Sequence, residues 1–158
     1  MKKILLGLFL MLGAISFAAP SRIDTNKAKQ NGYESLMNSK HLYSISKQIN
    51  NDSSLNIVYS TGVLLDDESI RSYSESLKEE QEEDGFEYIS SGESEAGYVH
   101  KLYSKSVESF YYIVVGKSSK VKGYVIVGTL QTPEEYSSKA DLKKTISFVI
   151  TEGDKYLK

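Results

Sequence analysis

Apolar and polar residues alternate along the chain in a way that separates strand-like from helix-like segments. Residues 42–47 and 55–60 both alternate with a period of two, which is typical of half-buried strands. The stretch 50–53 between them consists of turn-forming residues, so we expect a hairpin. The polar segment 19–40 shows no sustained period, and we interpret it as an N-terminal arm with one or two helical turns near 33–37.

A helix is expected after this hairpin. Asp66 is a good N-cap residue, and Ile70, Tyr73 and Leu77 follow at spacings of three and four, which places them in one narrow apolar stripe. Gly85 suits the left-handed position that follows a helix C-terminus. The pattern therefore predicts a surface helix that begins at Asp66 and ends before Gly85.

The second half of the chain predicts a run of strands and a closing helix. Four strands are expected, at 86–89, 97–104, 110–115 and 124–130. The last two are apolar on both faces, so both faces must be covered in the fold. Thr132 and Pro133 are suitable residues for a helix start, and we expect a helix or a helix pair to run from there to about Ile150.

This order of elements is typical of an α+β protein, with an antiparallel β-sheet of about five to six strands flanked by helices. We expect one such domain over 41–152, followed by a short C-terminal tail at 153–158. A chain of this size can bury enough surface to form its own core, and we expect a monomer.

The first 18 residues have the three parts of an export signal. Two lysines open it, residues 4–17 are almost entirely apolar, and Ser16 and Ala18 place small side chains at the −3 and −1 positions of a cut before Ala19. The apolar run is shorter than the roughly 20 residues that a membrane-spanning helix needs. We therefore expect a cleaved signal peptide over 1–18. The mature protein is expected to be soluble, without a membrane span, in a periplasm or outside the cell.

The composition excludes several kinds of chemistry. The chain has no cysteine, which excludes disulfides, thiol catalysis, zinc–thiolate sites and a lipid-modified N-terminal cysteine. It has 19 basic and 21 acidic residues, and loss of the two leader lysines changes the net charge from −2 to −4. A mildly acidic domain does not suit a phosphate backbone, so we expect no nucleic-acid partner.

Three short motifs resemble catalytic or phosphate-binding signatures without completing them. The segment 92–97 is close to a G-x-S-x-G elbow around Ser94, but its second glycine comes one residue late. Ser44 and Lys47 fit S-x-x-K but lie in a predicted strand, where residues three apart point to opposite faces. The segment 116–118 lacks the earlier glycine of a phosphate loop, and we interpret it as part of a turn. No catalytic residue is assigned.

The titratable residues give weaker signals. His41 and His100 are the only histidines, and we interpret His100, in the middle of a strand, as structural rather than as a metal ligand or a general base. No cofactor and no metal site are expected. A dense acidic run at the end of the first helix is interpreted mainly as solvated surface, because a helix presents its acids outward whereas a Ca²⁺ site wraps a loop around the ion. Its members are the weak partner-binding candidates, Glu79, Glu80, Glu82, Glu83 and Asp84.

The chain also resembles the PsbP-like group, which includes DcrB-type bacterial envelope proteins and a eukaryotic Ran-binding import factor. The resemblance covers about 110 of the 140 mature residues, from Leu42 to Ile150. It implies an α/β/α sandwich and a non-enzymatic protein that docks to others. The chain departs from the group in having neither Trp nor Pro in its first strand and no lipobox cysteine. The segments that carry the resemblance are 43–46, 70–77, 86–91, 97–102, 110–115, 124–130 and 142–148.

These observations favour an exported binding or accessory protein of the bacterial envelope that docks to a protein partner and is not an enzyme. One alternative is a secreted effector or adhesin that meets host molecules. A less favoured alternative is a small secreted hydrolase, which would require Ser94 or Ser44 to lie beside His100 in the folded chain.

Overall fold

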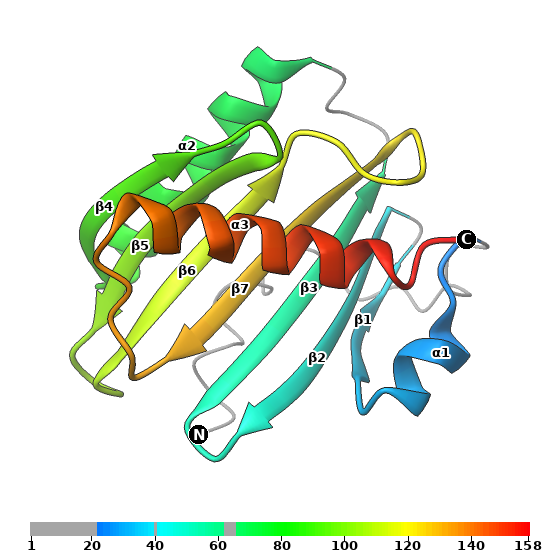
Figure 1. Ribbon diagram of the computed structural model, residues 1–158, viewed down its shortest axis with the longest axis horizontal. Coiled ribbons are helices and arrows are strands. Elements are labelled where there is room, and N and C mark those ends of the chain that lie inside the picture. The colour runs from blue at the N-terminus through cyan, green and yellow to red at the C-terminus, as the bar shows by residue number, and fades with distance from the viewer. Residues whose placement is uncertain (1–21, 40, 62–65) are drawn as a thin grey trace.

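The structure is a computed structural model that describes residues 22–39, 41–61 and 66–158; the expected signal peptide lies outside these ranges. In the described part, one antiparallel sheet has the strand order β1-β2-β3-β7-β6-β5-β4 (Figure 1). Its seven strands are β1 (Glu34–Asn38), β2 (Leu42–Asn50), β3 (Ser53–Thr61), β4 (Glu87–Glu93), β5 (Gly97–Ser104), β6 (Ser109–Gly116) and β7 (Tyr124–Thr132).

The predicted fold class is wrong in its sheet, which has seven strands rather than five to six and is richer in strand than the expected α+β sandwich. The additional strand is β1, in the segment where helical turns were expected. Its residues do not alternate in polarity, and it is held by pairing with β2, from Glu34 opposite Ser46 to Asn38 opposite Tyr43, across a bulge. A strand that depends on a tertiary partner in this way has no periodic signal in the sequence.

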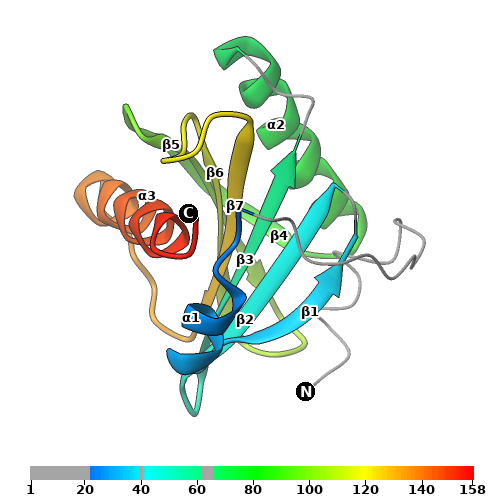
Figure 2. The same cartoon turned by 90° about the vertical axis from the view of Figure 1, so that its right-hand side faces the viewer.

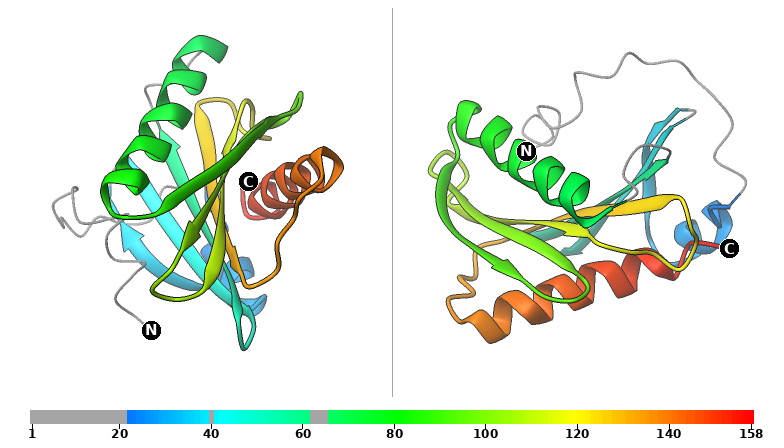
Figure 3. Two further views of the ribbon diagram at one scale, coloured as in Figure 1. Left: turned by 90° about the vertical axis from the view of Figure 1, so that its left-hand side faces the viewer. Right: turned by 90° about the horizontal axis from the view of Figure 1, so that it is seen from above.

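Three helices complete the described fold: α1 (Thr25–Gln30), α2 (Asp67–Glu83) and α3 (Lys139–Asp154). Helices α2 and α3 lie on opposite faces of the sheet (Figure 2). Helix α2 contacts β4, β5 and β6, whereas α3 crosses β4 to β7 on the other face (Figure 3). Within the described ranges, no helix is long and apolar enough to cross a membrane.

Each face of the sheet has its own core. Tyr112 of β6 and Ile146 of α3 belong to the cluster under α3, and Ile113 of β6 and Ile70 of α2 belong to the cluster under α2. Strands β5, β6 and β7 contribute to both clusters. The prediction that the strands at 110–115 and 124–130 are covered on both faces is therefore confirmed.

The ends of α2 follow the sequence pattern. The Asp66 carboxylate accepts a hydrogen bond from the Ser69 backbone N–H at 2.7 Å, as an N-cap should. Gly85 has φ +89°, the left-handed conformation expected just after the helix.

The start of α3 differs from the sequence prediction. Thr132 is the last residue of β7 and pairs with Phe110 of β6, so the sheet continues to the residue that was expected to cap the helix. The helix begins at Lys139, and Ser138 caps it by accepting a hydrogen bond from the Asp141 backbone N–H at 3.0 Å. Residues 133–138 form the link between β7 and α3, which lies against β6 and β5 through Tyr112 and Lys101. Thr132 and Ser138, six residues apart, could each cap a helix. Because Thr132 is paired within the sheet, Ser138 becomes the cap.

The two ends of the described chain meet beside α1. Ile23 forms an antiparallel bridge with Leu157, and the Asp24 backbone N–H donates to the Tyr156 carbonyl oxygen at 2.7 Å. Tyr156 and Leu157 are buried, and the Tyr156 ring meets that of Tyr33 edge-on. The residues that precede β1 and those that follow α3 therefore close the core at this end of the sheet.

Candidate functional site

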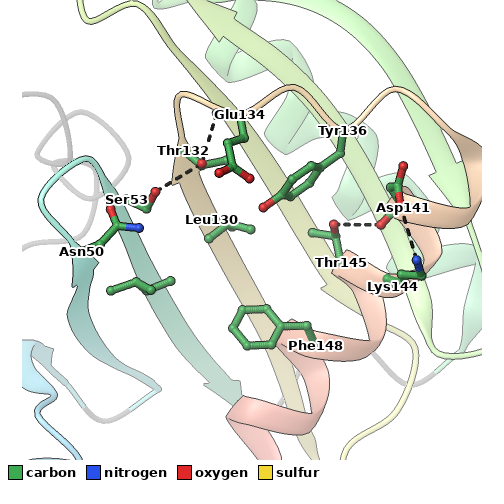
Figure 4. Close-up of a pocket in the computed structure, with 11 residues that line it drawn as sticks. Asn50, Ser53, Leu130, Thr132, Glu134, Tyr136, Asp141, Lys144, Thr145 and Phe148 are labelled. Carbon is green, nitrogen blue, oxygen red and sulfur yellow. Dashed lines mark hydrogen bonds and ion pairs between the residues drawn. The ribbon is translucent and has the colours of Figure 1, made fainter.

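A groove with a volume of about 420 Å³ opens on the α3 face of the sheet (Figure 4). Its walls come from the β2–β3 hairpin, the end of β7, the link at 133–138 and the side of α3 that carries Asp141 and Phe148. The side chains that line it are Ile49, Asn50, Ser53, Leu130, Thr132, Glu134, Tyr136, Asp141, Lys144, Thr145 and Phe148.

The groove is apolar at its centre. Ile49 on β2 is 46 % exposed and Phe148 on α3 is 45 % exposed, and Leu130 of β7 is the buried residue between their elements. Phe148 is exposed because α3 directs Ile146, Val149 and its other core residues toward the sheet, so position 148 falls on the outer side of the helix. Two large apolar side chains thus face solvent around one concave surface, which is a feature of binding sites.

The link at 133–138 is held in place by Tyr112 of β6. The Tyr112 hydroxyl donates to the Glu134 carbonyl oxygen at 3.2 Å and accepts from the Tyr136 backbone N–H at 2.6 Å. The Tyr112 and Tyr136 rings stack with their centroids 4.9 Å apart. Burial raises the pKa of Tyr112 to about 12, so its hydroxyl stays protonated. One wall of the groove is therefore fixed by a buried tyrosine rather than left as a loose loop.

The charged groups of the groove lie at its rim. A hydrogen bond from Ser138 holds the pKa of the Asp141 carboxyl below its usual value, and Lys144, whose Nζ is 3.6 Å from Asp141 Oδ1, contributes in the same direction. Glu134 is exposed on the link. The rim carries both signs of charge, and the centre carries none.

Three hydroxyl groups of the groove are hydrogen-bonded within it. Ser53 Oγ donates to Thr132 Oγ1 at 3.2 Å, and Thr132 Oγ1 also accepts from the Glu134 backbone N–H at 3.2 Å. Thr145 Oγ1 donates to the Asp141 carbonyl oxygen at 2.9 Å. No histidine is among the lining residues. The apolar centre of this arrangement can take up an apolar group.

The chemistry-bearing residues singled out from the sequence lie elsewhere. Ser44 is fully buried in β2, and Ser94 lies in the β4–β5 turn, where its backbone N–H donates to the Gly97 carbonyl oxygen at 2.9 Å. Lys117 belongs to the 116–118 segment that resembles part of a phosphate-binding loop. Its ammonium group lies 2.6 Å from the carboxylate of Glu93. The hydroxyl groups that contact the His100 ring are instead those of Ser74 and Ser91. The 92–97 segment joins two antiparallel strands, since β4 extends to Glu93 and β5 begins at Gly97.

His100 instead bridges α2 and β4. Its Nε2 lies 2.8 Å from Ser74 Oγ and its Nδ1 lies 2.7 Å from Ser91 Oγ. Burial lowers the pKa of His100, an effect that the nearby carboxylate of Glu75 opposes. Ser91 is exposed in the middle of β4, the last strand of the sheet. Through these contacts His100 ties helix α2 to strand β4.

The acidic candidates are not part of the groove. Glu79, Glu80, Glu82, Glu83 and Asp84 are all exposed at the C-terminal end of α2, on the opposite face of the sheet from α3. In the described ranges, no group of three or more His, Cys, Asp or Glu residues is arranged to hold a metal ion.

Sequence reasoning did not identify the groove, because its walls come from four separate elements. One usable signal existed. The closing helix places its buried residues at 142, 146, 149 and 150, and Phe148 is a large apolar residue outside that stripe. An off-stripe aromatic residue on an amphipathic helix is a candidate for a binding surface.

Comparison with known proteins adds no relative: no protein-family model matches the chain, and no curated protein matches it.

Proposed function

We propose that this protein is an exported, non-enzymatic binding or accessory module of the bacterial envelope that docks to a protein partner through the groove between the β2–β3 hairpin and α3. The observation that carries the proposal is the exposure of Ile49 and Phe148 around one apolar hollow. Isolated exposed apolar residues need no explanation, but a pair of them around a concavity is costly to leave in water.

The size and lining of the groove favour a protein ligand. A volume of about 420 Å³ accommodates one or two large side chains, and Ile49, Leu130 and Phe148 give the groove apolar surface for them to contact. A partner segment that inserts an aromatic or branched aliphatic side chain against Phe148, with polar contacts to Glu134 and Lys144 at the rim, fits this arrangement. The buried centre and polar rim are the usual anatomy of a protein interface.

Two further considerations support the proposal. The sequence has the leader of an exported protein, and its resemblance to the PsbP-like group implies a docking role. Export is tested by N-terminal sequencing of the protein recovered from outside the cytoplasm. A start at Ala19 is expected, and a start at Met1 would contradict the proposed signal peptide.

The docking role is tested by affinity capture from envelope extract with the tagged mature domain in three forms: wild type, Phe148→Ser and Leu36→Ser. Leu36 on β1 is 52 % exposed, so its replacement removes a similar amount of exposed apolar surface at a site outside the groove. We expect one partner to be retained by the wild type and by Leu36→Ser and to be lost with Phe148→Ser. Equal retention of the partner by all three forms would show that the groove is not the docking site.

A further inference from the structure

We propose that Ser91 of β4 is a nucleophile activated by His100, and that it takes up the acyl group of a carboxylic ester at the surface of the domain. The two residues meet on the α2 face of the sheet, whereas the docking groove lies on the α3 face. The inference therefore goes beyond the proposed docking role, and the two can fail separately. Acylation of one serine requires no turnover, so it is compatible with a binding module.

Ser91 combines an exposed position with a contact to a buried base. It lies directly opposite His100 in the pairing of β4 with β5, and its Oγ is 2.7 Å from His100 Nδ1. Ser91 is exposed, whereas His100 is only 2 % exposed. A nucleophile that faces solvent, with a base at hydrogen-bond distance behind it, provides the first two parts of a site for acyl transfer.

The other ring nitrogen of His100 is held from α2. His100 Nε2 lies 2.8 Å from Ser74 Oγ and 3.9 Å from the carboxylate of Glu75. The carboxylate favours a proton on Nε2, which leaves Nδ1 to accept the hydroxyl proton of Ser91. Burial lowers the pKa of His100, so its ring is neutral near pH 7, as a general base must be. Helix α2 thus supplies the positioning residues that orient the base.

A β-bulge brings a third polar group to the same oxygen. Tyr88 lies opposite Leu102 and Ser91 lies opposite His100, and residues two apart in β5 share a face of the sheet. Tyr88 and Ser91 are three apart but share that face, because the bulge inserts one additional residue between them. The Tyr88 hydroxyl lies 2.9 Å from Ser91 Oγ. When the Ser91 proton is directed to His100, Tyr88 donates to Ser91 Oγ and stabilises the negative charge that develops there.

The reaction is the transfer of an acyl group from an alcohol oxygen to a serine oxygen. Ser91 Oγ forms a bond to the carbonyl carbon of the ester while its proton passes to His100 Nδ1. The bond between that carbon and the alcohol oxygen then breaks, the oxygen keeps the electron pair, and His100 returns the proton to it. The products are acyl-Ser91 and the free alcohol. An ester suits this exposed site better than an amide, because an alcohol oxygen leaves more readily and little binding energy is supplied to drive a harder step.

The test treats the mature domain with p-nitrophenyl acetate and locates the acetyl groups by mass spectrometry of the digested protein. We expect acetyl-Ser91 as the product that forms fastest, together with release of p-nitrophenol. The same chain unfolded in urea should lose this preference, because Ser91 is then no longer beside His100. Ser91→Ala should lack the product.

Two variants separate a reaction assisted by His100 from the reactivity of any surface serine. His100→Gln cannot accept the proton, and acetylation of Ser91 should slow by at least about a hundredfold. Ser94 in the neighbouring turn, whose Oγ accepts from the Ala96 backbone N–H at 3.2 Å, provides the matched control. Ser94→Ala should be acetylated at Ser91 at the wild-type rate.

The comparison of folded with unfolded wild type needs no substitution, so it decides the matter even if His100→Gln is unstable. Three results would each overturn the inference. They are acetylation confined to lysines or other serines, equal acetylation of Ser91 in the folded and unfolded chains, and an unchanged rate at Ser91 in folded His100→Gln.

Discussion

A Cβ atom on Gly128 would lie 2.1 Å from Cγ1 of Val149, so the absence of a side chain at this point of β7 is what allows α3 to approach the sheet. The same relationship recurs along the helix. A Cβ on Gly116 would lie 2.6 Å from the Ile150 side chain. On the helix itself, a Cβ on Gly153 would lie 2.8 Å from Ile126. Three glycines therefore set the distance at which α3 packs, and with it the width of the groove beside the helix.

We expect Gly128→Ala to lower the free energy of unfolding by about 1–3 kcal/mol, because the new methyl group overlaps a fully buried valine between two well-packed layers. The double variant Gly128→Ala, Val149→Ala should be more stable than the sum of the two single changes predicts. Val149→Ala removes the Cγ1 methyl group with which the new methyl group at position 128 would clash. Urea unfolding of the four proteins gives the coupling energy. Strict additivity would mean that the two positions do not touch.

The sequence was most informative where the local pattern and the tertiary environment agree. The strands at 110–115 and 124–130 were recognised because both of their faces are apolar, and both faces are indeed covered. The helix from Asp66 to the residue before Gly85 was recognised because its cap, its stripe and its terminating glycine all indicate the same element.

The sequence was least informative where tertiary pairing decides the local structure. Strand β1 forms because its backbone pairs with the edge of β2. Thr132 remains part of the sheet because it pairs with Phe110 of β6. The groove and the neighbours of His100 depend on which elements lie side by side, and no local pattern contains that information. The serines beside His100 are Ser74 and Ser91, which differ from the two that the sequence motifs singled out.

His100 makes a specific prediction about pH. Its pKa is lowered by burial from the value of 6.5 that an unperturbed histidine has. The unfolded chain therefore binds more protons than the folded chain as pH falls through this range, and the free energy of unfolding decreases with it. We expect stability to be lower at pH 5 than at pH 7.5. The carboxylates of Glu75 and Glu82 raise the pKa of His100, whereas Lys78 lowers it in the same direction as burial, and the net shift is downward.

The measurement is the midpoint of urea unfolding at several pH values between 5 and 7.5, for the wild type and for His100→Gln. Glutamine can still hydrogen-bond to Ser74 or Ser91 but does not titrate. The variant should show a flatter pH dependence across this interval. Since the carboxyl groups with lowered pKa values titrate below it, an unchanged slope in His100→Gln would assign the pH dependence to another group.

Lys101 provides a third prediction, because its side chain is only 2 % exposed although it carries a charge. Its Nζ lies 2.6 Å from Glu135 Oε1 and 5.1 Å from the centre of the Phe110 ring. Glu135→Ala should lower the unfolding midpoint, since it leaves the buried ammonium with the aromatic ring but without its counter-ion. Adding Lys101→Met removes the charge and keeps the apolar stem, so it should recover part of that loss. Thermal or urea unfolding of the wild type, Glu135→Ala and the double variant measures their order of stability. A double variant that is less stable than Glu135→Ala would contradict the prediction.

Phe148 and Val149 are neighbours on α3 and should respond to truncation in opposite ways. Val149 is fully buried against the sheet, and Val149→Ala should cost about 1.5–3 kcal/mol of stability through lost burial and the cavity left behind. Phe148 is 45 % exposed at the groove, so Phe148→Ala should cost less than about 1 kcal/mol. Binding of the partner should be affected in the opposite way. We expect Phe148→Ala to lose the partner, whereas the folded Val149→Ala protein should still bind it. This reversal separates a residue kept for binding from one kept for packing: if Phe148→Ala destabilised the domain as much as Val149→Ala, the exposed ring would belong to the core and the groove would lose its main contact.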